Sequence, residues 1–363
     1  MKPAVSVSPP ESSAHRPHQR HVLAAATRLH LGQASSPPLD LAVKIHQFAS
    51  VCASLQEELV NPSAGAATTV ESSPSETSRR RPRSLGVDTV VGLLAVDATP
   101  KLPDYDLVAA VQQACTDWTA SNHNHASTAK SSSSSLPVLQ VVPVTPWGTF
   151  VLALNALLHV AKQDHDADSI LFCSAETVVS SAAVQVMLPQ LWSPTNSDDA
   201  NHATGKEAQQ EKEEDDTLVV GAVLPGHDYH APLPSTAAGG SLTVEPIALS
   251  GVTTPWNTLA LWNVRKLALT GFLFVSEGLL TDPQTAPSLG VEEVATIAVL
   301  QQLLGTQRAK AKLVPVPGVA WDATFAGDNK RKQWHDEKMK SKQIRAARQL
   351  ELLNDLTGLV YHF

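Results

Sequence analysis

The chain has 363 residues and a formal net charge of −8, and 43% of its residues are hydrophobic. This length suits one large domain or two small ones, and the negative charge argues against a nucleic-acid-binding protein. No apolar run approaches the roughly 18 residues that a transmembrane helix needs, so we expect no membrane span. The three cysteines, Cys52, Cys115 and Cys173, are isolated in the sequence, which favours a reducing compartment over a zinc site or a disulfide framework.

Residues 1–84 are predicted to be mostly disordered, with one helix near residues 41–59. The chain before residue 39 is rich in Pro, Ser, His and Arg, and Glu11 is its single acidic residue. Such a composition is typical of a disordered tail and also occurs in organelle transit peptides. We therefore expect a cytoplasmic protein or, in the second case, an organellar one. Residues 41–59 repeat apolar side chains at helical spacing, whereas residues 61–84 have the composition of a solvated linker.

Beyond residue 85 the chain alternates between apolar, strand-like runs and segments with helical spacing. The sequence predicts strands at 87–96, 138–144, 170–173, 217–224, 242–249 and 312–316, and a short apolar run at 272–275. Between and after them it predicts helices at 107–118, 149–162, 178–191, 258–270, 290–305 and 328–355. Polar, low-complexity insertions near 121–135 and 193–216 are expected to be loops. This alternation predicts one α/β domain over residues 85–363, in which helices flank a Rossmann-like mixed sheet.

Polar residues follow several of the predicted strands. Because parallel α/β sheets place their ligand sites at the carboxyl ends of the strands, we expect these side chains to share one edge of the sheet. They are, in chain order, Asp97, Ser174, Glu176, His227 and Asp228. The His-x-x-His spacing of His227 and His230 is open to two interpretations, a metal pair or a polar loop that contacts a ligand.

The motifs that identify the common α/β enzymes are absent. The sequence has no G-x-G-x-x-G after its first strand, no Walker A motif, no G-x-S-x-G and no H-E-x-x-H. A nucleotidyltransferase would need a glycine-rich phosphate loop after the first strand, and residues 98–101 contain no glycine.

Several short segments at element ends carry a resemblance. They are Asp97, Ala153-Leu154-Asn155, Ser174-Ala175-Glu176, the segment 255–272 that ends in Gly-Phe, Glu292-Glu293 at the start of a helix, and Trp321-Asp322 before a basic tail. In this order the segments resemble GT-A-type glycosyltransferases, the large family that uses nucleotide-diphosphate sugars. The resemblance extends from about Val87 to the C-terminus.

The resemblance implies a cleft with a donor half and an acceptor half. The donor-binding residues it implies are Asp97, Ser174, Glu176, Lys330 and Arg331, the last two as cations for the diphosphate. It implies a Mg²⁺ or Mn²⁺ ion held by Glu176 and His335. The acceptor-binding residues it implies are Trp256, Asn257, His227 and Asp228, with Glu292 or Glu293 as the catalytic base.

One departure separates the chain from this family. Family members end the corresponding strand in Asp-x-Asp, which gives a divalent cation two carboxylates, whereas Ser-Ala-Glu gives one. The sequence is therefore also consistent with a metal-independent transferase, with an inactive relative, or with a non-catalytic α/β binding module. Ordinary structural roles stay open too, because acidic residues favour a helix N-terminus, tryptophans are common in cores and charged helices are often simply solvated.

Overall fold

The protein is built around a mixed β-sheet. The computed structural model describes residues 21–30, 40–60, 87–126, 136–175, 177–192, 216–234, 242–277, 291–321 and 329–363. Within these ranges the spatial order of the sheet is β3 (Val138–Val144), β2 (Val87–Asp97), β1 (His21–Leu29), β4 (Ser169–Cys173), β10 (Leu259–Asn263), β6 (Thr217–Ala222), β11 (Lys310–Val314), β13 (Leu359–His362) and β9 (Pro246–Ala248). β10 runs antiparallel to both of its neighbours and β9 antiparallel to β13, and the other pairs are parallel.

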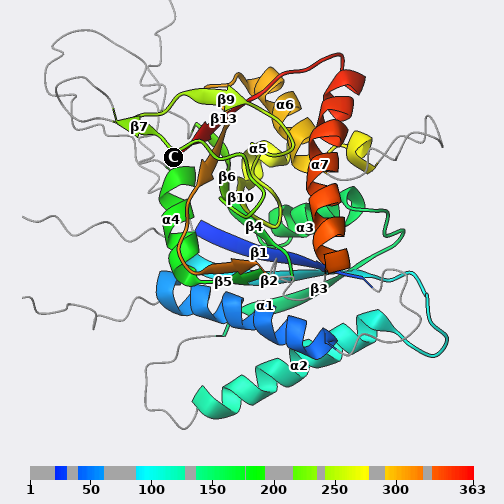
Figure 1. Ribbon diagram of the computed structural model, residues 1–363. Helices are drawn as coiled ribbons and strands as arrows, with labels where there is room; N and C mark the ends of the chain where they lie inside the picture. The colour runs from blue at the N-terminus through cyan, green and yellow to red at the C-terminus, as the bar shows by residue number, and fades with distance from the viewer. Residues whose placement is uncertain are drawn as a thin grey trace, which may run out of the picture.

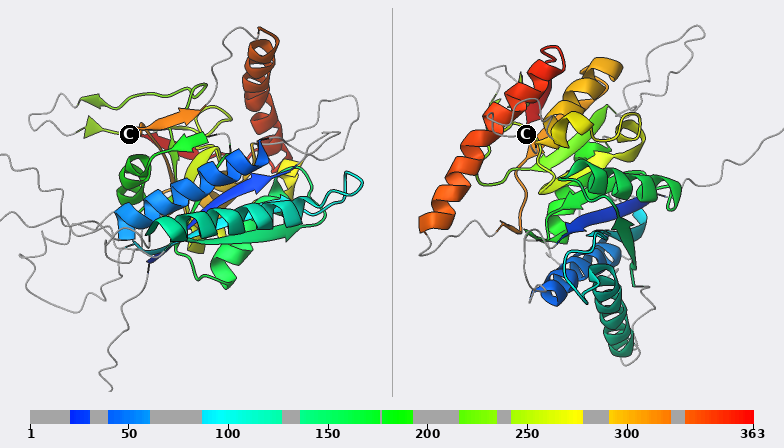
Figure 2. Two further views of the ribbon diagram at one scale, coloured as in Figure 1. Left: turned by 90° about the horizontal axis from the view of Figure 1, so that it is seen from below. Right: turned by 90° about the vertical axis from the view of Figure 1, so that its right-hand side faces the viewer.

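Helices cover both faces of this sheet, as Figures 1 and 2 show. One face carries α1 (Leu41–Leu55), α2 (Leu107–Ala126) and α4 (Ser181–Leu191), and α1 continues into a π-helical turn, η1 (Gln56–Val60). The other face carries α3 (Val151–Gln163), the short α5 (Val264–Leu267) and α6 (Glu292–Leu304). The long α7 (Asn329–Leu352) packs outside α6, and a 3-10 turn, η3 (Phe274–Glu277), lies near both. Small two-stranded sheets join β5 (Thr177–Val179) to β12 (Val319–Trp321) and β7 (Leu233–Pro234) to β8 (Leu242–Thr243).

Each face of the sheet has its own apolar core. Trp262, Phe172 and Leu157 lie in the core beneath α3 and α6. Phe48 and Leu94 lie in the core beneath α1, α2 and α4. The central strands contribute alternate side chains to both layers, which explains why their sequences are almost continuously apolar. Of the helices in the described ranges, none has both the length and the apolar composition that crossing a membrane requires.

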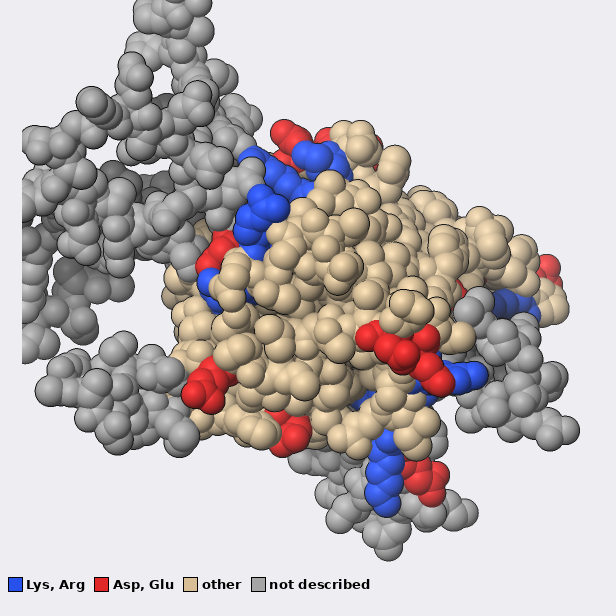
Figure 3. Space-filling view, turned by 90° about the horizontal axis from the view of Figure 1, so that it is seen from above, with Lys and Arg blue, Asp and Glu red and all other residues tan. Residues whose placement is uncertain are grey.

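The surface shows little segregation of charge on one face of the molecule. Seen from above, small groups of Lys, Arg, Asp and Glu side chains lie mainly at the margins of a largely uncharged surface (Figure 3). The described residues on this face therefore form no broad electrostatic surface for a polyanion.

Residues 21–29 correct the expected start of the folded domain. The sequence predicts an N-terminal tail here, with the domain beginning near residue 85. Instead they form β1, which pairs in parallel with β2 on one side and β4 on the other. The run His-Val-Leu-Ala-Ala-Ala-Thr-Arg-Leu contains three consecutive alanines, which have a weak local preference for strands, so its conformation depends on the two neighbours.

Residues 258–270 correct a second expectation. A single helix was predicted there, but the structure has a strand, β10, followed by the four-residue α5. β10 is buried at every position between β4 and β6, so its apolar side chains show no strand-like alternation. The short run at 272–275 lies partly in η3, and β13 near the C-terminus was not anticipated.

The strand predicted at 242–249 is divided between β8 and β9, which belong to different sheets, and β5, β7 and β12 were not predicted. The other elements agree with the predictions within a few residues. The helix near 41–59 and the strands at 87–96, 138–144 and 170–173 are confirmed. α2 extends to Ala126, into the insertion that was expected to be a loop from residue 121. The rest of that insertion, and residues 193–215, lie outside the described residues.

Asn155 of α3 links this helix to Phe272, in the chain that follows α5. Its Nδ2 atom donates to the carbonyl oxygen of Phe272 at 2.9 Å, and its Oδ1 atom accepts from the Phe272 N–H at 2.8 Å. Gly271 has a φ of 63°, and a Cβ atom built there would lie 2.8 Å from the same Oδ1 atom. A glycine is therefore required where α3 meets the chain that leaves α5.

We expect Asn155→Ala to lower the free energy of unfolding by about 2 kcal/mol, because both backbone groups of Phe272 lose their partners. Urea unfolding monitored by circular dichroism would measure the change. Asn122→Ala is the matched control, since Asn122 bonds only within α2, to Trp118. Equal effects of the two substitutions would contradict a cross-linking role for Asn155.

Candidate functional site

Most of the described site residues predicted from sequence lie along one edge of the sheet. β1, β2 and β4 are parallel, so their carboxyl ends share this edge. β10 is antiparallel and begins there, and α6 precedes the parallel strand β11, so its N-terminus is at the same edge. This carboxyl edge holds two polar clusters, one at β1 and β2 and one at β10 and α6.

Asp97 anchors the first cluster, at the end of β2. It is 2% exposed, its Oδ1 atom accepts the Thr99 N–H at 3.0 Å, and its Oδ2 atom lies 2.6 Å from Lys101 Nζ. Burial acts to raise the pKa of Asp97, but the Lys101 ammonium and the Thr99 hydrogen bonds outweigh it and lower the pKa. The carboxylate is therefore held ionised with a cation beside it.

His30, just after β1, lies among several cations. Its ring centroid is 5.7 Å from that of Trp147, which belongs to the turn between β3 and α3. Partial desolvation of the ring lowers the pKa of His30, and the charges of Arg28, Lys101 and Lys44 lower it further, against the opposing charge of Asp97. His30 is therefore neutral at pH 7, and an anionic ligand would relieve the repulsion among its neighbours.

We call Arg28, His30, Lys44, Asp97 and Lys101 the cation cluster. Sequence reasoning predicted only Asp97 among these residues, and it missed Arg28 and His30 because it placed residues 21–29 in a tail. The apolar run that precedes Arg28 was the available signal, since a strand there would have put Arg28 and His30 at a carboxyl end. The Arg28 guanidinium lies 4.9 Å from the centre of the Phe150 ring, which fixes it next to the start of α3.

Glu277 caps the N-terminus of α3 from η3, which is remote in sequence. Its carboxylate accepts N–H groups from Thr149 at 2.5 Å, from Phe150 at 2.8 Å and from Val151. Burial acts to raise the pKa of Glu277, but these backbone hydrogen bonds outweigh it and lower the pKa. The carboxylate thus satisfies N–H groups that a helix leaves without partners, and it fixes the turn that carries Trp147.

The second cluster is built on Asn257, two residues before β10. Its backbone N–H donates to Glu293 Oε1 at 2.5 Å, and its Nδ2 atom donates to Glu292 Oε1 at 3.3 Å. Its own Oδ1 atom accepts from Trp262 Nε1 at 2.8 Å. Asn257 therefore ties both carboxylates of α6 to the sheet. We call Asn257, Glu292 and Glu293 the carboxylate cluster.

The two glutamates are unusually buried for charged residues. Glu292 is 5% exposed and Glu293 is 4% exposed. Burial, and then the neighbouring charge of Glu292, raise the pKa of Glu293 to about 8, although Lys342 and the Asn257 N–H act to lower it. One proton is therefore held in this pair near neutral pH, which is where a general acid or base is most effective.

α7 supplies cations to this cluster. Lys342 acts on Glu293, and both Glu292 and Glu293 act electrostatically on the half-buried Arg345. The spacing of three residues places Lys342 and Arg345 on one side of the helix. Lys330 and Arg331, the diphosphate-binding cations that the resemblance implies, lie earlier in α7, and their side chains lie outside the described residues.

Trp256 lies in the core, and its ring faces are covered. It is 1% exposed and its Nε1 atom donates to the carbonyl oxygen of Gly251 at 2.9 Å. The His227 ring stacks on the indole at a centroid distance of 3.7 Å, and Lys342 Nζ lies 3.2 Å from the same centroid. Two groups so close cannot share one face, so they lie on opposite faces. An acceptor could contact Trp256 only by displacing one of them.

His227 is engaged through both ring nitrogens, which corrects the metal-pair interpretation. Nδ1 accepts the Leu224 N–H at 2.8 Å, and Nε2 lies 3.0 Å from the carbonyl oxygen of Thr254. Burial, and then the charge of Lys342, lower the pKa of His227 to about 3. The neighbouring Asp228 is exposed and pairs with His230 at 3.2 Å instead of joining the carboxylate cluster.

The predicted metal ligands are not tested by this structure. Glu176 and the side chain of His335 lie outside the described residues, and Ser174 donates its backbone N–H to the carbonyl oxygen of Thr258. Among the side chains that the structure describes, no group of three or more His, Cys, Asp or Glu residues could hold a metal ion.

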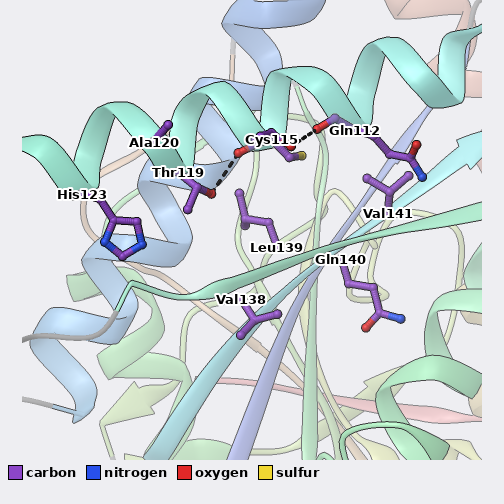
Figure 4. A pocket seen from close by; sticks show the side chains of 10 residues that line it. Gln112, Cys115, Thr119, Ala120, His123, Val138, Leu139, Gln140 and Val141 are labelled. Atoms are coloured by element: carbon purple, nitrogen blue, oxygen red, sulfur yellow. Dashed lines mark hydrogen bonds between the residues drawn. The ribbon is translucent and has the colours of Figure 1, made fainter.

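A groove between α2 and the edge strand β3 lies apart from these clusters. Its volume is about 690 Å³. Its lining, drawn in Figure 4, comprises Gln112, Cys115, Thr116, Thr119, Ala120 and His123 of α2 and Val138, Leu139, Gln140 and Val141 of β3. Burial raises the pKa of Cys115 to about 11, so this thiol is not a nucleophile at neutral pH. The groove offers no acid–base pair among its described residues, and the carboxyl edge remains the better candidate for chemistry.

Comparison with known proteins adds no constraint to this assignment. No protein-family model and no curated protein matches the chain. Function is therefore inferred from the two clusters themselves.

Proposed function

We propose that the protein transfers a sugar from a nucleotide-diphosphate donor to a hydroxyl group of an acceptor. The observation that carries the proposal is that a buried carboxylate pair, Glu292 and Glu293, lies on the same sheet edge as the cations around His30, one of which, Lys101, pairs with Asp97. A reaction that releases a diphosphate from a hydroxyl attack needs these two kinds of group, one for the leaving charge and one for the proton.

The cation cluster suits the donor. Arg28 would neutralise the diphosphate together with Lys44 and Lys101, because guanidinium and ammonium groups form strong charge-assisted hydrogen bonds with phosphate oxygens. The two lysines would exchange their present partners, Asp40 and Asp97, for phosphate oxygens. Asp97 accepts hydrogen bonds and would contact a ribose hydroxyl or the base. A mixed sheet with helices on both faces agrees with the fold that the resemblance implies.

The carboxylate cluster suits the acceptor. As the acceptor oxygen forms its bond to the anomeric carbon, the bond from that carbon to the diphosphate oxygen breaks. The diphosphate leaves with the electron pair, and the acceptor proton passes to an oxygen of the ionised form of Glu293, whose share grows as the pH rises toward about 8. The Asn257 N–H holds this carboxylate in place, and the charge of Glu292 raises its pKa.

A divalent cation does not fit the residues described at the cation cluster. Asp97 already engages Lys101 and the Thr99 N–H, and Glu277 engages the start of α3. A hard cation such as Mg²⁺ prefers several free oxygen ligands. No step of the proposed reaction depends on a metal. The cationic side chains of the cluster neutralise the negative charge of the leaving diphosphate.

A second candidate is a non-catalytic module that binds a ligand at the same edge. The specific observation in its favour is the burial of the carboxylate pair, together with the cover on both faces of Trp256. Such a module would bind a nucleotide sugar at the cation cluster without turning it over.

Thermal-shift titration with a panel of nucleotide sugars, with and without Mn²⁺, tests the proposal. We expect at least one donor to raise the melting temperature, because a ligand at 100 times its Kd adds about 2.7 kcal/mol to stability. Arg28→Ala should weaken the binding of that donor about tenfold through the loss of a charge-assisted contact. Arg348→Ala is the control and should not change this affinity, because Arg348 is exposed and pairs with Glu351.

Release of nucleoside diphosphate then separates the two candidates. Slow donor hydrolysis that disappears in Glu293→Gln supports the transferase. Binding without any turnover supports the non-catalytic module. Absence of stabilisation by every donor in the panel would contradict both candidates.

A further inference from the structure

α7 packs against α6, which carries both glutamates of the carboxylate cluster, and against Trp256, the neighbour of Asn257. Lys342 Nζ rests 3.2 Å from the centre of the Trp256 indole. A Cβ atom built on Gly251 would collide with the carbonyl group of Lys342, with the carbonyl carbon 2.6 Å away. The backbone of α7 thus touches the turn whose Gly251 carbonyl accepts the Trp256 N–H.

Among the α7 side chains whose burial is described, those of residues 337 and 340–352, the apolar contacts with the core come from Ala346 and the partly buried Leu350. The fully buried positions in this part of α7 are Ala346, at 1% exposure, and Gln349, at 0%, while the large apolar Ile344 is 73% exposed. The cation-bearing residues Lys342 and Arg345 are half-buried on the side that faces the glutamates. Because small and polar side chains contribute little hydrophobic free energy, α7 is the kind of element that opens locally while the rest of the fold stays intact.

We propose that α7 is an inhibitory cover of the acceptor side, whose Lys342 side chain occupies the Trp256 face and whose displacement exposes Glu292 and Glu293. The identification of the covered site as an acceptor site rests on the proposed function. The cover itself rests on the contacts of Lys342 with Trp256 and Gly251.

The cover accounts for the two features that a transferase site would not otherwise show. The carboxylate pair is 5% and 4% exposed, and the indole has a histidine on one face and an ammonium group on the other. His227 is fixed by two hydrogen bonds to the backbone, whereas Lys342 reaches the ring on a flexible stem from a weakly held helix. Lys342 is therefore the group that gives way, and a sugar ring is a suitable replacement because indoles stack on sugar faces.

Hydrogen–deuterium exchange of the full-length protein tests the cover independently of activity. Lys342→Ala removes the cation–π contact, and Gly251→Ala forces a Cβ atom against the α7 backbone. We expect either change to speed amide exchange in residues 341–352 about tenfold, with exchange in α6 and β6 unchanged. Lys340→Ala, at an exposed position two residues away, is the matched control and should change nothing.

Two results would overturn the proposal. One is unchanged exchange of residues 341–352 in both variants. The other is an equal increase in α6 and β6, which would mean that α7 is part of the global unfolding unit.

Activity measurements then distinguish this proposal from the transferase proposal. Faster exchange in α7 together with faster sugar transfer supports both. Faster exchange with no transfer from any donor supports the cover and rejects the transferase. Transfer at the wild-type rate in variants whose α7 has opened rejects inhibition by the cover and leaves the transferase in place.

Discussion

Glu293→Gln is expected to stabilise the protein at alkaline pH and to abolish sugar transfer. Glu293 is 4% exposed, and its raised pKa of about 8 means that ionisation is unfavourable in the fold. Glutamine keeps the oxygen that accepts the Asn257 N–H and removes the charge that repels Glu292. A glutamine side chain cannot take up a proton, however, so the acceptor proton loses the oxygen to which the proposed reaction delivers it.

Because the pKa of Glu293 is raised in the fold, the free energy of unfolding falls as the pH rises. A folded-state pKa above the ordinary value of 4.5 means that the native state holds a proton that the unfolded chain releases. The stability that protonated Glu293 contributes is fully present below pH 4.5 and is lost as the pH rises through about 8. At about 1.4 kcal/mol for each pKa unit, the loss amounts to at most about 5 kcal/mol.

Urea unfolding at pH 5.5 and pH 8.5 measures this effect. The wild-type free energy of unfolding should fall between the two values, and the fall should be much smaller in Glu293→Gln. Glu351→Gln is the control, since Glu351 is exposed and pairs with Arg348 on the surface. If the variant and the wild type lose the same stability over this range, Glu293 is not the group that titrates.

Glu277→Ala is expected to cost about 3 kcal/mol at pH 7, which is the largest loss we expect from a partly exposed residue. The Thr149, Phe150 and Val151 N–H groups would all lose their acceptor, and each hydrogen bond to a charged group contributes on the order of 1.5 to 3 kcal/mol. The expected loss lies well below the sum for three hydrogen bonds because water molecules would bond to the N–H groups that Glu277 releases. The same change frees the turn that carries Trp147, so donor binding should weaken as well.

The stabilisation by Glu277 has the opposite pH dependence to that of Glu293. Its pKa is lowered in the fold, so the contribution is present above the ordinary value of 4.5 and disappears as the pH falls through the folded value. Urea unfolding at pH 7 and pH 3 should therefore show a smaller effect of Glu277→Ala at the lower pH. Glu277→Gln, which retains one acceptor oxygen, should lie between the alanine variant and the wild type. An alanine variant as stable as the wild type at pH 7 would exclude the capping role.

The sequence alone determined the α/β class and the strand ends of the site. β2, β3 and β4 are runs of apolar, often β-branched residues, and α3 repeats its apolar side chains at helical spacing, so local patterns are sufficient there. Asp97 was found because a polar residue ends a buried strand. The site role of Glu292 and Glu293 was implied only by the resemblance, because acids at a helix start are common without any function. The structure ties both side chains to the predicted Asn257.

Tertiary structure alone decided the rest of the site. β1 and β10 are strands because each is enclosed by two neighbours, and this pairing energy leaves no periodic signal in a strand buried on both faces. Glu277 meets Val151 across 126 residues, and Lys342 meets Trp256 only because α7 folds back over the carboxyl edge. A sequence pattern reports on neighbours within a few residues, whereas these contacts depend on where whole elements pack. The sequence therefore specified the carboxylates, and the packing of α7 and η3 decided their burial, protonation and cover.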